Sequence, residues 1–256
     1  IMRWGEKRYH SLDYELKQMF KEKVYKIALN GGMTCPNRDG HVGTGGCIFC
    51  SSQGSGDFAG SARLSIAEQI RQGKADISSK RPVHSYIAYF QAFTGTYAPI
   101  DRLRALYTEA IADPEVKILS IATRPDCLGA DVLALLDEIN QIKPVWVELG
   151  LQTIHPETSA YIRRGYELSV FEQAVKELRA IGITVIVHTI LYLPGETKDD
   201  MLDTIHYLNH MDIQGIKLQL LHVLTHTDLA ADYEKHPFYI PDMQDYIQFL
   251  GTCIAH

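Results

Sequence analysis

Long apolar runs are missing from these 256 residues, and so is the composition of a disordered chain. No stretch of about 18 apolar residues occurs, which excludes a membrane-spanning helix of ordinary length. Hydrophobic residues make up 46% of the chain, too many for intrinsic disorder. The first nine residues are polar and charged, so we expect no secretory signal. The five cysteines are few and odd in number, which favours reduced thiols in the cytoplasm over a disulfide framework.

Charge is spread unevenly along the chain. The formal net charge is −6, which argues against bulk non-specific binding of nucleic acid. The first 82 residues nevertheless contain 13 basic and 8 acidic residues. This basic part indicates either a polyanionic partner or, more simply, solvated helix faces.

Short runs rich in β-branched and aromatic residues alternate with amphipathic stretches after residue 23. The predicted strands are mostly apolar on both faces, as in parallel sheets covered by helices. Six βα units are fewer than the eight of a closed barrel, which leaves an open barrel or a doubly wound sheet. The predicted strands are 24–30, 84–91, 116–122, 145–151, 183–189 and 216–222, and the predicted helices are 66–77, 100–111, 131–142, 170–181 and 197–211.

No linker rich in proline, glycine or serine divides the chain. We therefore expect one domain over residues 1–256, with residues 1–23 as an N-terminal extension. Residues 252–256 read as an unfinished helix, so we expect a further C-terminal portion.

Three bunched cysteines directly follow the first predicted strand, at the edge where α/β proteins place their ligands. Cys35, Cys47 and Cys50 have the spacing C-x11-C-x2-C in a glycine-rich segment. Three thiolates suit an iron–sulfur cluster with one free iron, or a zinc site completed by His41. The remaining cysteines, Cys127 and Cys253, are predicted to be ordinary apolar thiols.

The C-x2-C end with Phe49 before its last cysteine, after the first of six βα units, resembles the radical S-adenosylmethionine (SAM) superfamily. The first gap is longer than the superfamily's common C-x3-C-x2-C and is similar to the group that includes the Elongator catalytic core. Further stretches resemble the bacterial YhcC/YtqA branch, and these are 2–5, Tyr9, 35–40, 89–96 and 193–196.

The resemblance implies a [4Fe-4S] cluster on the three cysteines, with SAM bound at the free iron. It also implies an electron donor such as flavodoxin or ferredoxin, and a 5′-deoxyadenosyl radical that abstracts hydrogen from the substrate. The implied fold is an α/β open, partial TIM-like barrel of six parallel units, with the active site at the C-terminal mouth of the strands. No catalytic residue beyond the cluster ligands is assigned.

The resemblance also implies contacts to SAM. Gln91 and Thr94 take the place of a glycine-rich segment that meets the methionine amino group. Arg164 lies in an arginine motif and is predicted to pair with the methionine carboxylate, although a surface position is the alternative.

Four further residues are predicted to contact SAM. Glu148 on an apolar strand is predicted to bind ribose hydroxyls or the ammonium, because an unpaired buried carboxylate is costly. Gln152 and His188 follow at or near strand ends, and Leu221, or alternatively Val223, is predicted to cover adenine. The alternative for His188 is a hydrogen-bonded core histidine.

The likeness to the Elongator core implies tRNA as substrate, at the wobble uridine side chain. A small metabolite is the alternative for the same chemistry, and a zinc-binding interaction protein is a third hypothesis. The basic residues predicted to meet phosphates are Arg3, Lys7, Arg8, Lys17, Lys21, Lys23 and Lys26.

Overall fold

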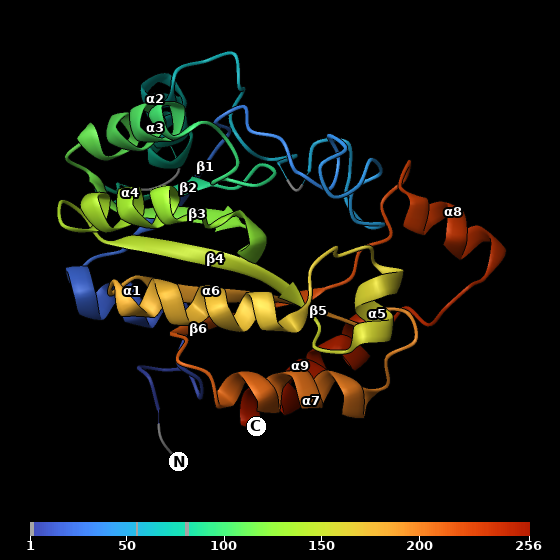
Figure 1. Cartoon of the computed structure of the whole chain (residues 1–256). Coiled ribbons are helices and arrows are strands. Elements are labelled where there is room, and N and C mark those ends of the chain that lie inside the picture. Colours follow the sequence, from blue (N-terminus) through green and yellow to red (C-terminus); the bar gives the residue numbers. More distant parts are fainter. Residues whose placement is uncertain (1–2, 55, 80–81) are drawn as a thin grey trace.

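The computed structural model describes residues 3–54, 56–79 and 82–256, in which six parallel strands alternate with helices (Figure 1). Met2, part of one stretch that carries the resemblance, lies outside the described residues. The sheet order is sequential, from β1 to β6, so β1 and β6 are its two edges. The strands are β1 (Tyr25–Leu29), β2 (Tyr86–Phe90), β3 (Val116–Thr123), β4 (Val145–Gln152), β5 (Thr184–Leu191) and β6 (Gly215–Leu220).

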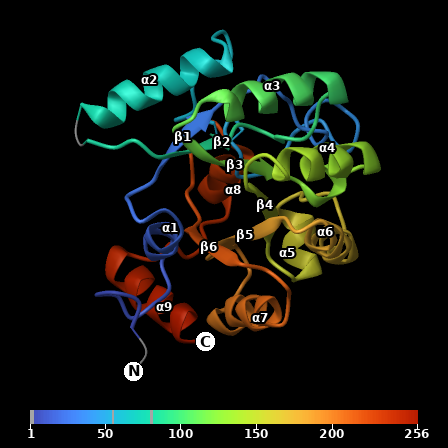
Figure 2. The same ribbon diagram turned by 90° about the vertical axis from the view of Figure 1, so that its left-hand side faces the viewer.

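All six predicted strands are confirmed within two residues at either end, and sequential order excludes the doubly wound alternative. The sheet curves into an open half-barrel, as Figure 2 shows with the strands seen from their N-terminal ends. The five predicted helices form as α2 (Ile66–Ser78), α3 (Ile100–Ala112), α4 (Ala130–Asn140), α6 (Leu168–Ala180) and α7 (Lys198–Asn209), and they follow the outer side of this arc.

Local signals set the helix ends. The Thr197 side chain caps α7, and the Asp200 carboxylate accepts a hydrogen bond from the Thr197 N–H, so a capping box is present. Gly182, with φ 73°, follows α6 and adopts the left-handed conformation expected after a helix.

Successive side chains of each strand point to opposite faces of the sheet, so the inner, concave face and the outer face carry different residues. On β1, Ile27 and Leu29 point outward and join the large core between sheet and helices. Lys26 lies between them in sequence and therefore points to the inner, concave side. An apolar run in the sequence does not by itself show which side chains of a strand face the concave side.

A short helix that the sequence analysis missed closes the barrel at the N-terminal ends of the strands. In α1 (Leu12–Phe20), Leu16 is 3% exposed and packs with Val24, Ile87 and Trp146, and Phe20 packs against the same cluster. Because β2 and β4 begin within one residue of Ile87 and Trp146, this apolar cluster lies at the base of the barrel. We call the part of this cluster that does not line the cavity the apolar plug, and its residues are Leu16, Phe20, Val24, Ile87, Ile118, Trp146 and Ile186.

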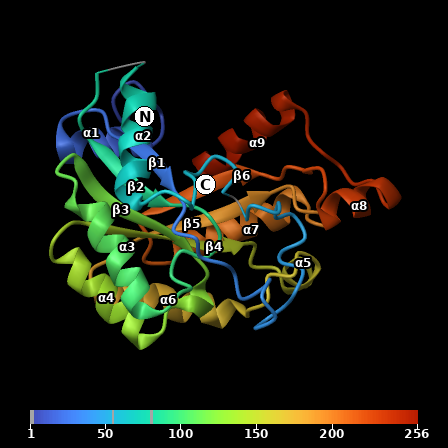
Figure 3. The ribbon, with the colours of Figure 1, turned by 90° about the horizontal axis from the view of Figure 1, so that it is seen from above.

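The opposite end of the strands carries the long connections. Figures 1 and 3 agree in placing the segment after β1 there, together with α5 (Pro156–Tyr161) and α8 (Asp228–Lys235). The last helix, α9 (Met243–Ala255), packs beside α7 through a cluster that contains Cys253, 3% exposed. The prediction that Cys253 is an apolar thiol is confirmed. No helix among the described residues is long and apolar enough to span a membrane.

Candidate active site at the mouth of the barrel

The predicted site residues surround one cavity at the carboxyl ends of the strands. Its volume is about 490 Å3, within the range of small-molecule sites. Proximity does not define what each side chain binds, so the individual roles stay predictions. The predicted residues that line the cavity are Cys35, Cys47, Cys50, Gln91, Thr94, Glu148, Gln152, Arg164, His188 and Leu221.

Asn37 holds the cysteine segment in place. Its side chain donates from Nδ2 to the carbonyl oxygen of Arg163, 2.6 Å away, and to Sγ of Cys47, 3.6 Å away. The N–H of Gly46 donates to the Asn37 carbonyl at 2.7 Å. Gly46 has φ 72°, and a Cβ there would lie 2.9 Å from Nε of Arg38. Glycine is therefore required at this close approach.

Cys47 lies in an electropositive corner of the cavity. A hydrogen bond from Cys50, with the nearby Arg124 and Arg38 guanidinium groups, lowers the pKa of Cys47 to about 7 in spite of its burial. Metal ligation uses the thiolate form of cysteine. Cys47 therefore reaches its ligating form near neutral pH.

The cysteines are not gathered as one zinc ion requires. With Zn–S bonds of about 2.3 Å, tetrahedral sulfur ligands lie roughly 3.8 Å apart. Among the described residues, the one group of three or more His, Cys, Asp or Glu ligand atoms all within 4.8 Å of one another contains no cysteine. His41 packs edge-on against Tyr97 and does not line the cavity. The donor set fits a cubane cluster, in which each thiolate binds a different iron.

The end of β4 carries an acceptor without a donor. Gln152 has φ 65° at an irregularity in the ladder between β4 and β5, and it lines the cavity. Its Oε1 atom is buried and has no hydrogen-bond partner among the described residues. An unsatisfied buried group costs roughly 1–3 kcal/mol. A ligand with a hydroxyl or ammonium group would relieve that cost, and SAM carries both.

The segment after β2 is tied to the cysteine segment. The N–H of Gln91 donates to the carbonyl of Leu29, and the N–H of Thr94 to that of Thr34, each at 3.2 Å. The Thr94 side chain is 2% exposed. The predicted methionine-binding segment therefore lies directly beside the start of the cysteine segment.

Arg164 does not have the free guanidinium that a bidentate carboxylate contact requires. Its Nη1 donates to the carbonyl oxygens of Leu151 and Thr153, at 2.9 and 2.6 Å. Its Nε and Nη2 donate to the carbonyl of Tyr166, at 3.2 and 3.1 Å. We therefore correct the predicted role, because Arg164 fastens the end of β4 to the following segment. The alternative of a surface residue is also wrong, since Arg164 is 4% exposed.

Arg124, to which the sequence analysis gave no role, supplies a fixed positive charge. It pairs bidentately with Asp126, at 2.9 and 2.7 Å, and donates from Nη1 to the Arg164 carbonyl at 2.9 Å. Burial opposes its charge, but Asp126 outweighs burial and raises the pKa of Arg124. Its proximity to Cys47 favours the thiolate.

A layer of polar side chains crosses the concave side below the strand ends. The carboxylate of Glu148 is 1% exposed and accepts hydrogen bonds from Ser120 Oγ and His188 Nε2, both at 2.7 Å. It also accepts from Nζ of Lys26, which lies 4.3 Å from the ring centroid of Tyr89. We call this layer the polar floor, and its residues are Lys26, Tyr89, Ser120, Glu148, His188 and Lys217.

Glu148 thus accepts three hydrogen bonds within the protein, and its predicted contact with SAM, which would use a remaining acceptor position, stays a prediction. Burial opposes ionisation of Glu148, but the His188 hydrogen bond and the Lys26 ammonium hold the pKa of Glu148 well below its usual range. Burial lowers the pKa of His188, against the pull of Glu148. In this pair His188 Nε2–H donates to the Glu148 carboxylate. His188 thus matches the hydrogen-bonded alternative.

Three of the seven basic residues predicted to meet phosphates have partners within the protein. Lys26 belongs to the polar floor, and Lys17 and Lys23 both pair with Asp13 on α1. The prediction was wrong for Lys26, because residue spacing alone does not tell which face of a strand a lysine occupies.

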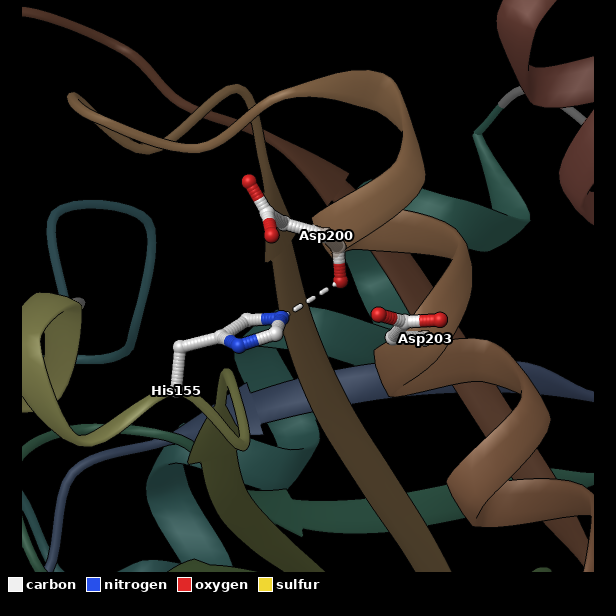
Figure 4. A group of neighbouring side chains, drawn as sticks. All are labelled: His155, Asp200 and Asp203. Carbon is white, nitrogen blue, oxygen red and sulfur yellow. Dashed lines mark hydrogen bonds between the residues drawn. The ribbon is translucent and has the colours of Figure 1, made fainter.

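A second cluster of potential ligands, His155, Asp200 and Asp203, lies outside the cavity (Figure 4). His155 Nε2 lies 2.7 Å from the backbone carbonyl oxygen of Asp200. The Asp200 carboxylate accepts from the N–H and Oγ1 of Thr197, each at 2.7 Å. These groups fasten the first turn of α7 to the segment after β4, so we assign the cluster a structural role.

Comparison with known proteins agrees with this geometry. The chain is 45% identical over 245 residues to YtqA of Bacillus subtilis, covering 96% of this chain and 76% of YtqA. It is 38% identical over 244 residues to YhcC of Escherichia coli, covering 94% of this chain and 77% of YhcC. The chain spans about three quarters of these relatives.

Solved structures show the same fold at low sequence identity. The archaeal Methanocaldococcus infernus Elp3 has a TM-score of 0.69 at 15% identity, over 90% of this chain and 53% of Elp3. Coproporphyrinogen III oxidase (HemN) from Escherichia coli has a TM-score of 0.60 at 16% identity, over 92% of this chain and 52% of HemN. This chain spans about half of each of those two proteins.

The model of the radical SAM superfamily matches residues 37–208. Members of this family use a [4Fe-4S] cluster and SAM and need a reductant. The predicted fold and cofactors are confirmed, and the chain belongs to the radical SAM superfamily.

Proposed function

We propose that this enzyme cleaves SAM reductively at the mouth of the barrel and abstracts hydrogen from a small molecule bound deeper in the same cavity. The observation that carries the proposal is the shape of the interior. One cavity extends from the three cysteines down to Glu148 and His188 of the polar floor. The apolar plug closes the barrel below the floor.

Three cysteines would hold the cluster, which supplies the electron that cleaves SAM once a flavodoxin- or ferredoxin-like donor has reduced it. The unpaired Oε1 of Gln152 would accept a hydrogen bond from SAM, from a ribose hydroxyl or the ammonium. Thr94 and the backbone of Gln91 would meet the methionine part, and Leu221, 6% exposed, would cover the adenine. Arg124 would keep positive charge beside the thiolates.

A tRNA substrate is the second candidate. Four cations of the N-terminal segment are exposed and have no acidic partner among the described residues. This segment leads into α1, however, at the end of the strands opposite the cavity mouth (Figure 1). A tRNA held there would not present its base to the cysteine segment, so this candidate takes second place. The four cations are Arg3, Lys7, Arg8 and Lys21.

Two measurements test the proposal. Anaerobically reconstituted and reduced protein should form 5′-deoxyadenosine from SAM, and absence of this product would refute radical chemistry. The substrate class is tested by chromatography of tRNA nucleosides from cells that lack the gene. An altered nucleoside would replace the small-molecule proposal with the tRNA candidate.

A further inference from the structure

The lysine and arginine side chains that line the cavity differ in whether they have partners. Arg124 pairs with Asp126, and Arg164 donates to backbone carbonyls. Arg38 donates to the carbonyl oxygens of Cys50 and Ser51. These three guanidinium groups are therefore committed to holding the walls of the cavity.

Lys217 is different. It lines the cavity from β6, and its ammonium has no hydrogen bond or ion pair among the residues that the structure describes. It is the direct ladder neighbour of His188, so both side chains stand on the concave face in the same layer. Gln219, two residues further along β6, has the same orientation and also lines the cavity.

The charges of the polar floor do not cancel. Lys26 pairs with Glu148, and no acidic side chain among the described residues forms an ion pair with Lys217. Lys217 therefore leaves the floor with one uncompensated positive charge. Burial lowers the pKa of Lys217, the nearby Lys26 lowers it further, and Glu148 opposes both. A partly desolvated ammonium of this kind is stabilised by an anion.

The location of Lys217 also gives it access to a ligand. Part of the Lys217 side chain is exposed on the edge strand β6, and the same cavity extends from Lys217 and Gln219 to the three cysteines. A small molecule that enters this cavity can therefore contact Lys217.

We propose that Lys217 binds a carboxylate or phosphate group of the small-molecule substrate, with the Gln219 amide as a second donor. This inference rests on the proposed function and adds the chemical class of its substrate. A carboxylate offers two acceptor oxygens, which match one ammonium and one amide N–H group. The anion would fix one end of the substrate at the floor, with the rest directed toward the mouth.

The test uses the intact chain with its cluster reconstituted and SAM bound. Its melting temperature is measured against sodium succinate, inorganic phosphate and, at matched ionic strength, sodium chloride. We expect a saturable rise with succinate, with phosphate or with both, because a ligand that binds the folded state stabilises it. The anion that acts identifies the group as carboxylate or phosphate.

Variants assign the response to Lys217. Lys217→Met should raise the apparent dissociation constant of the active anion at least tenfold. Lys217→Arg, which keeps the charge, should bind that anion nearly as tightly as wild type. Lys176→Met, an exposed lysine on the outer helix α6, is the matched control and should respond like wild type. The proposal is wrong if wild type responds to neither anion beyond chloride, or if Lys217→Met responds like wild type. A Lys217→Met protein that loses SAM affinity while keeping the anion response would place Lys217 at the cofactor instead.

Failure of the inference differs from failure of the proposed function. Wild-type protein that forms 5′-deoxyadenosine but shows no Lys217-dependent response refutes this inference alone. Protein that binds the anion at Lys217 but never cleaves SAM refutes the radical chemistry and leaves the anion site standing.

Discussion

The two ends of the barrel interior are built in opposite ways. At the base, Leu16 and Trp146 are buried in the apolar plug, and just above it Glu148 accepts three hydrogen bonds. At the mouth, the backbone adopts left-handed conformations at Phe93 and Gln152, and the Gln152 side chain lacks a donor. Strained or unsatisfied groups persist where the surrounding structure holds them. The base therefore stabilises the fold, and the mouth is left for ligands.

The largest expected effect is on the mouth. Cys47→Ala should abolish both retention of the cluster, about four irons per chain, and formation of 5′-deoxyadenosine, because one of three thiolate ligands is lost. The free energy of unfolding of the apoprotein should change little. Iron analysis, visible absorbance and product assay measure this. Cys127→Ala, a thiol outside the cavity, is the control, and equal iron in both variants would contradict the assignment.

The next effect falls on the polar floor. Glu148→Gln should lower the free energy of unfolding by about 3 kcal/mol, because Lys26 then loses its counter-charge in a largely buried setting. Denaturant titration measures the loss. The double variant Lys26→Met with Glu148→Gln should recover part of it. The control is Glu234→Gln, which replaces an exposed carboxylate on α8. An equal loss in the free energy of unfolding in the control would show that the Lys26–Glu148 pair does not stabilise the fold more than a surface carboxylate does.

The plug should affect stability without affecting cofactor binding. Leu16→Ala should cost about 2 kcal/mol in the free energy of unfolding, through lost burial and a residual cavity. Iron content and SAM cleavage should stay at the wild-type level. Leu12→Ala, which is 44% exposed on the same helix, should cost much less. Loss of iron in Leu16→Ala would contradict the expectation that the base of the barrel does not affect cluster binding at the mouth.

A smaller effect concerns pH. Below about pH 6.5 an unfolded histidine binds a proton, whereas burial lowers the pKa of His188 and makes its imidazole bind a proton less readily, so the free energy of unfolding should fall as pH falls. Glu148, with its pKa lowered, acts in the same direction at more acidic pH. We expect the contribution of His188 to the free energy of unfolding to decrease progressively as pH falls from about 7 to about 5. His188→Gln should flatten that part of the stability profile, and parallel profiles would exclude His188 as its source.

The smallest effect is expected for a surface pair at the mouth. Arg163 Nη1 lies 2.5 Å from Asp228 on α8, and both side chains are about half exposed. Asp228→Asn should change the free energy of unfolding by less than about 0.5 kcal/mol, because solvent screens exposed pairs. A loss above 1 kcal/mol would mean that α8 stabilises the barrel through this contact.

Strand ends were predictable from the sequence because buried apolar runs mark parallel strands and their carboxyl ends converge at one edge. That rule is enough to bring Cys35 and Gln152 to the same cavity, far apart as they are in sequence. The polar floor was not predictable in the same way. Ser120 and Lys217 lie within their strands, where a single sequence does not show which face is concave.

The sequence also does not show whether the polar atoms of a buried side chain already have hydrogen-bond partners within the protein. Arg164 and Glu148 were correctly expected near the cavity, yet their polar atoms are used by the protein itself. Conversely, α1 was missed because it is a short helix in a highly charged segment, and its stability comes from tertiary packing.

The sequential sheet has one more consequence. No ladder hydrogen bond joins β1 to β6 in the part of the chain that the structure describes. The curvature of the sheet can therefore change, and with it the distance between β1 and β6, without breaking a strand pair. Any such change would move Lys217 on β6 relative to Lys26 on β1 and would therefore alter the width of the polar floor.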